Sequence, residues 1–110
     1  MGADAFIAFY GIEETIPVDA DVTALEERKD ERIVRARKAK LDFWWGRVSD
    51  GHDYHLLLGK KIANLGVEGA EGASIMDTDF ATLQDDVRKK LKDAGFASEP
   101  KLILKFEAQY

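Results

Sequence analysis

Two patterns of apolar positions mark the strands at the two ends of this chain. Residues 4–12 (DAFIAFYGI) are apolar at consecutive positions, which predicts a strand buried on both faces. Residues 101–108 (KLILKFEA) alternate between apolar and polar positions, which predicts an edge strand whose lysines lie on a wet face. Pro17 ends the first strand, because proline has no N–H to donate.

A helical spacing follows Pro17. Asp21 or Thr23 can cap a helix that runs to about residue 40, and Glu31 and Arg35 are spaced to form an ion pair on it. Its apolar stripe is thin and consists of Val22, Leu25, Ile33, Ala36 and Ala39. We therefore expect one amphipathic helix between the first strand and the aromatic-rich segment that follows.

A second helix is more fully specified by the sequence. Residues 77–79 supply N-caps and acidic charge for its first turn, and Gly95 ends it in the left-handed conformation. Phe96 is placed to fold back on Leu91 as the hydrophobic partner of that cap. The stripe that faces the sheet consists of Phe80, Leu83, Val87, Leu91 and Ala94.

Residues 43–59 (FWWGRVSDGHDYHLLLG) predict a β-hairpin. The pair at 50–51 is Asp-Gly, which favours a two-residue turn and makes the numbers of opposite residues sum to 101. Strand parity then places Trp45 with the more apolar set, which we assign to the core, and Trp44 on the other face. One face holds Phe43, Trp45, Arg47, Tyr54, Leu56 and Leu58, and the other holds Trp44, Gly46, Val48, Asp53, His55 and Leu57.

The elements follow each other as β-α-β-β-α-β. We expect residues 1–110 to form a single α+β domain, a ferredoxin-like two-layer sandwich with an antiparallel sheet and two helices on one face. The first and third strands are then central, and the second and fourth lie at the edges. The central strands are apolar on both faces, so a homodimer partner, a ligand or the 63–76 connection is expected to cover the second face.

Composition excludes some function classes. The chain has no cysteine, which excludes disulfides and thiolate metal sites, and no apolar run of membrane-spanning length. The net charge is −5, although residues 28–40 carry seven basic and two acidic side chains (+5), so the remaining residues sum to −10. These basic side chains surround a helix rather than one face of it, which disfavours nucleic-acid binding. We expect a cytoplasmic protein without membrane contact.

The two histidines lie close together in the sequence but carry only a weak indication of catalysis. His52 and His55 are three apart on a strand, so they point to opposite faces and no metal site is expected. Asp53 and His55 share a face and could form an acid–base pair. The simpler interpretation is that His55 lies across Gly46, which faces it in the hairpin. No cofactor is implied.

Association is the function that this pattern favours. We expect a homodimer or a complex with a protein partner, formed through the apolar second face of the sheet. The residues expected to make this contact are Trp44, Leu57, His55, Ile7 and Phe9. The alternative is a small-molecule binder or enzyme with a pocket between the sheet and residues 63–76, in which His55 and Asp53 act on the ligand.

Overall fold

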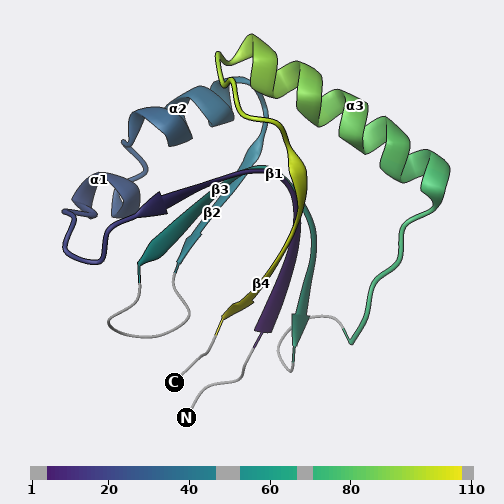
Figure 1. The fold of residues 1–110 in the computed structure, drawn as a ribbon, viewed down its shortest axis with the longest axis horizontal. Helices are drawn as coiled ribbons and strands as arrows, with labels where there is room; N and C mark the ends of the chain where they lie inside the picture. Colours follow the sequence, from purple (N-terminus) through teal and green to yellow (C-terminus); the bar gives the residue numbers. More distant parts are fainter. Residues whose placement is uncertain (1–4, 47–52, 67–70, 108–110) are drawn as a thin grey trace.

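A four-stranded antiparallel sheet forms the centre of the structure, a computed structural model that describes residues 5–46, 53–66 and 71–107. Its order is β2-β3-β1-β4, so β1 and β3 are central and β2 and β4 lie at the edges, as expected from the sequence. The chain is thus a small α+β protein (Figure 1). The strands are β1 (Ala5–Ile16), β2 (Asp42–Gly46), β3 (Tyr54–Gly66) and β4 (Lys101–Glu107).

The first helical segment is divided in two, so the expectation of one continuous helix up to residue 40 is wrong. The chain forms α1 (Thr23–Glu26) and then α2 (Glu31–Lys38). Arg28 has a φ of 59°, which interrupts a right-handed helix. Asp30 then begins the second helix, because its Oδ1 accepts a hydrogen bond from the Arg32 N–H at 2.9 Å. The apolar stripe is nevertheless placed correctly, since its members contact the core.

The second expected helix is α3 (Asp77–Asp93), and its end is as predicted. Gly95 has a φ of 87°, and the Phe96 N–H donates to the Leu91 carbonyl at 2.9 Å, which closes the C-terminal cap. The start differs: the N-cap is Met76, which makes no side-chain hydrogen bond. The acidic residues expected to cap the helix lie in its first turn, where their negative charges interact favourably with the helix dipole.

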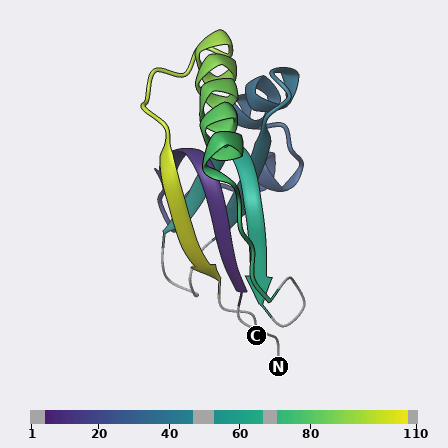
Figure 2. The same cartoon turned by 90° about the vertical axis from the view of Figure 1, so that its right-hand side faces the viewer.

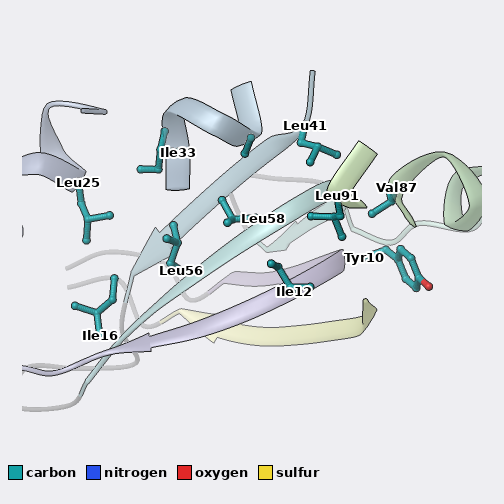
Figure 3. Packing of buried hydrophobic residues seen from close by; sticks show 11 residues of the cluster. Tyr10, Ile12, Ile16, Leu25, Ile33, Leu41, Leu56, Leu58, Val87 and Leu91 are labelled. Atoms are coloured by element: carbon teal, nitrogen blue, oxygen red, sulfur yellow. The ribbon is translucent and has the colours of Figure 1, made fainter. Parts of the chain in front are cut away.

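The three helices cover one face of the sheet and share a hydrophobic core with it (Figure 3). Leu25, Ile33 and Leu91 from the helices pack against Leu56 and Leu58 from β3. The remaining buried members are Tyr10, Ile12, Ile16, Ala36, Leu41 and Val87. We call this side of the sheet the helix face, and the opposite side the inner face, because the sheet is arched beneath the helices (Figure 1).

The central strands are longer than predicted, and their backbones approach closely at one point. Gly11 of β1 is the partner of Gly59 of β3. A Cβ atom added at Gly11 would lie 2.0 Å from the Leu58 carbonyl oxygen, and one added at Gly59 would lie 2.1 Å from the Tyr10 carbonyl oxygen. Only glycine fits at these two positions, and both strands curve strongly along their length (Figure 1).

The hairpin register is confirmed over the described residues. Gly46 pairs with His55, Trp44 with Leu57 and Asp42 with Gly59, and each pair of numbers sums to 101. The Asp-Gly turn itself, with Arg47, Val48 and His52, lies outside the described residues. β3 then continues to Gly66 because its second half pairs with the start of β1, so the expected 63–76 connection begins later than predicted.

Candidate interaction surface

The two faces of β4 are used in the opposite way from the sequence-based expectation. Ile103 is buried on the inner face, and Lys105 lies on the same side of the strand. The leucines instead lie on the helix face, where Leu102 is 52% exposed and Leu104 is 70% exposed. The alternation of KLILKFE correctly predicts a strand, but the solvent-exposed face of this strand carries leucines rather than lysines.

These leucines belong to a larger exposed apolar surface. Phe6, the neighbour of β4 on β1, is half exposed, and its ring lies 5.1 Å from that of Phe106. Ile75 and Met76, just before α3, are also exposed. Figure 2 shows the reason, since the lower parts of β4, β1 and β3 extend beyond the end of α3. We call the following set the β4 surface: Phe6, Ile75, Leu102, Leu104 and Phe106.

A shallow apolar pocket borders the β4 surface. It has a volume of about 200 Å³ and lies between the helix face of the sheet and residues 73–75. Ser74 is the polar residue among those that line the pocket. The other lining residues are Ala8, Ile62, Ala63, Leu65, Ala73, Ile75, Phe80, Leu102 and Leu104. The pocket therefore lies beside the expected connection, but on the face opposite to His55.

The inner face is a second hydrophobic core. Ile7, Phe9 and Leu57 are buried at 2% exposure or less, and Ile103 and the partly buried Trp44 pack with them. This face was expected to be covered by a homodimer partner, a ligand or the 63–76 connection, but its central side chains are already buried within the curved sheet. A partner could contact them only after a rearrangement. Their role in partner binding therefore stays a prediction, with Trp44 as the most accessible member.

His55 and Asp53 are held by different partners. The Asp53 carboxylate accepts a hydrogen bond from the Val18 N–H at 3.0 Å and so fastens the end of β1 to β3. The His55 Nδ1 lies 2.9 Å from Oε2 of Glu13, and the Lys105 ammonium group contacts the same oxygen. A carboxylate, an imidazole and an amine from three strands thus converge on the inner face. The proposed pairing of Asp53 with His55 stays a prediction.

The electrostatics of this group centre on Glu13. Burial raises the pKa of its carboxyl group. The hydrogen bond and charge of Lys105, with smaller effects of His55 and Lys101, lower this pKa by more than burial raises it. The net result is a Glu13 pKa below the ordinary value of 4.5. Glu13 is therefore held as a carboxylate, and its negative charge is matched by neighbouring cations.

Glu13 was not predicted as a member of this group, although the sequence contains a signal for its position. Glu13 has the same strand parity as Ile7 and Phe9, which places it on the inner face once the first strand is extended to residue 16. The expectation that His55 lies across Gly46 is also wrong. The indole of Trp44 takes that place, and a Cβ added at Gly46 would lie 2.8 Å from its Cζ2.

Part of the basic segment 28–40 is used within the protein. Arg32 is bound by the carboxylates of Asp30 and Glu14, at 2.9 and 2.6 Å. Arg35 donates two hydrogen bonds to the Ala94 carbonyl, at 2.9 and 2.8 Å. These arginines connect helices and strands. Two of the seven basic residues in the segment therefore have structural roles.

A comparison of the chain with models of protein families finds no match, and comparisons with curated proteins and with solved structures find none either. In the part of the chain that the structure describes, no helix has both the length and the apolar character needed to cross a membrane.

Proposed function

We propose that this protein acts by association with another protein chain, through the β4 surface. The observation that carries the proposal is the exposure of Leu102 and Leu104 on a strand at the edge of the sheet. Full burial of each such side chain against a partner contributes roughly 1.5–3 kcal/mol to the free energy of association. The expected association through an apolar sheet face is thus kept, but on the helix face rather than the inner face.

Two further features support this choice. Phe6 and Ile75 add exposed apolar area beside the leucines, because Phe6 pairs with Phe106 of β4 and Ile75 lines the same pocket as Leu102 and Leu104, so these residues form one patch rather than isolated positions. Contiguous patches of this kind are typical of interaction sites, whereas single exposed apolar residues are common on any surface. We also propose a ferredoxin-like arrangement, which is supported by the edge positions of β2 and β4 and by helical connections on one face.

Sedimentation velocity tests association directly. The wild type is compared with a double variant, Leu102→Thr and Leu104→Thr, which keeps the strand propensity and removes apolar area. Val34→Thr is the matched control, because Val34 is an exposed apolar residue on α2. We expect a concentration-dependent mass above one chain for the wild type and the control, and a single-chain mass for the double variant. Equal masses for all three proteins would contradict the proposal.

The apolar pocket supports a second candidate function, the binding of a small apolar molecule. Its volume of about 200 Å³ is sufficient for a compact aromatic or short acyl group. His55 and Asp53 take no part in this candidate, because His55 lies on the inner face. An apolar probe such as benzene or a short-chain fatty acid should raise the melting temperature of the wild type, and less so that of Ala63→Phe, which fills the pocket. No shift for any probe would contradict it.

A further inference from the structure

The edge formed by β4 is open on one side. β4 pairs with β1, and no other strand of the described residues lies on its far side. An open edge presents unpaired N–H and C=O groups along its length. Within the described residues, the other edge strand, β2, has five residues and β4 has seven. The exposed leucines of β4 therefore lie on a free edge of the sheet.

We infer that the partner is a second copy of this chain, whose β4 pairs antiparallel with β4 of the first about a two-fold axis. This inference rests on the proposed function and specifies its geometry. Pairing identical strands in this way joins two four-stranded sheets into one and satisfies both open edges. It also brings the two β4 surfaces onto the same side of the joined sheet.

The register of this pairing follows from parity and charge. Opposite residues of an antiparallel pair point to the same face, so a symmetric pair must have numbers with an even sum. A sum of 206 would place Lys101 opposite Lys105, and a sum of 210 would place Lys105 opposite itself. Like charges directly opposite each other destabilise a sheet. Sums of 204 and 212 avoid both contacts but pair only three residues of the strand, whereas a sum of 208 avoids both contacts and pairs the whole of Lys101–Glu107.

The register with a sum of 208 has favourable contacts on both faces. On the helix face, Leu104 lies opposite its own copy, and Leu102 lies opposite Phe106, so apolar side chains form one continuous row. On the inner face, Ile103 lies opposite Lys105. The ammonium group of Lys105 is bound to Glu13 within its own chain, so it is neutralised there and does not protect the edge from pairing.

Disulfide crosslinking tests this register, because the natural chain contains no cysteine. Directly opposite Cα atoms lie about 4.5–5.5 Å apart, which a disulfide can bridge. We expect Leu104→Cys to form a covalent dimer with itself under mild oxidation. Leu102→Cys and Phe106→Cys should each form little disulfide-linked dimer alone, because residue 102 lies opposite residue 106. The two variants should crosslink when they are mixed. The matched control is Val34→Cys, which should not crosslink.

The outcomes separate the geometry from association itself. If the wild type sediments as a dimer and Leu104→Cys does not crosslink, the β4 pairing is wrong and the proposed association stands. Efficient self-crosslinking of Leu102→Cys would also overturn the register. A wild type that sediments as a single chain at every concentration would overturn both this inference and self-association. Should Leu104→Cys fail to fold, the mixture of the other two cysteine variants gives the same test.

Discussion

The carboxylate of Glu13 and the imidazole of His55 lie 2.9 Å apart on the inner face, on neighbouring strands β1 and β3. Lys105 of β4 contacts the same carboxylate oxygen. The three side chains therefore connect three strands across the curved sheet. This polar group lies on the same face of the sheet as the inner core, and it should contribute to stability in a pH-dependent manner.

Glu13→Gln should lower the free energy of unfolding by about 1 kcal/mol at neutral pH, because it removes a partly exposed charged hydrogen bond. The pKa of Glu13 is lowered in the folded protein, so its contribution is fully present above the unfolded value near 4.5. It is lost as the pH falls through the lowered folded pKa. Urea unfolding of both proteins across acidic to neutral pH measures this difference.

The control for this prediction is Glu31→Gln, which removes an exposed carboxylate on α2 whose contact with Arg35 is long, at 3.8 Å. We expect little change in its free energy of unfolding at any pH. A Glu13→Gln deficit that stays constant from neutral to strongly acidic pH would show that the charge of Glu13 is not its cause.

Gly11→Ala should destabilise the protein strongly, by about 3 kcal/mol or more, because its Cβ would overlap the Leu58 carbonyl group of the neighbouring strand. Gly72→Ala is the matched control, since a Cβ there meets nothing within 4 Å. Thermal unfolding measures both. A Gly11→Ala protein with the wild-type melting temperature would contradict the close approach of β1 and β3.

Leu57→Ala should lower the free energy of unfolding by about 3 kcal/mol, because Leu57 is fully buried in the inner core. Leu104→Ala, the same change on the exposed β4 surface, should change the stability of the single chain by about 0.5 kcal/mol or less. Denaturant unfolding at low protein concentration provides the comparison. Equal costs for the two variants would contradict the inner face as a core.

Arg35→Lys should destabilise the protein by about 1 kcal/mol, because a lysine side chain does not reproduce the two hydrogen bonds to Ala94 or the guanidinium contact with the ring of Phe96. Arg37→Lys is the control on the same helix, at an exposed position, and should have little effect. A loss of stability that is the same for both variants would show that the contact between α2 and α3 is not the cause.

The sequence predicted the features that depend on local chemistry. The Asp-Gly pair and strand parity were sufficient to give the register of β2 and β3, including the opposite faces of Trp44 and Trp45. Gly95 and Phe96 were sufficient to give the end of α3. Each of these features is determined by residues that are close together in the sequence.

The features that the sequence did not reveal depend on distant contacts. The group of Glu13, His55 and Lys105 joins three strands, and its geometry requires the full pairing of the sheet. The exposed face of β4 depends on where α3 begins, which alternation alone cannot indicate (Figure 2). The break at Arg28 requires a positive φ at a residue that does not favour it, so local propensity predicted a continuous helix.

The most direct test of the account is the sedimentation of the wild-type protein beside Leu104→Thr, measured over a wide range of concentrations. The account predicts a reversible equilibrium between one and two chains for the wild type, shifted toward one chain by the loss of Leu104. A wild type with the mass of a single chain throughout, or a variant that associates equally well, would contradict self-association through the β4 surface.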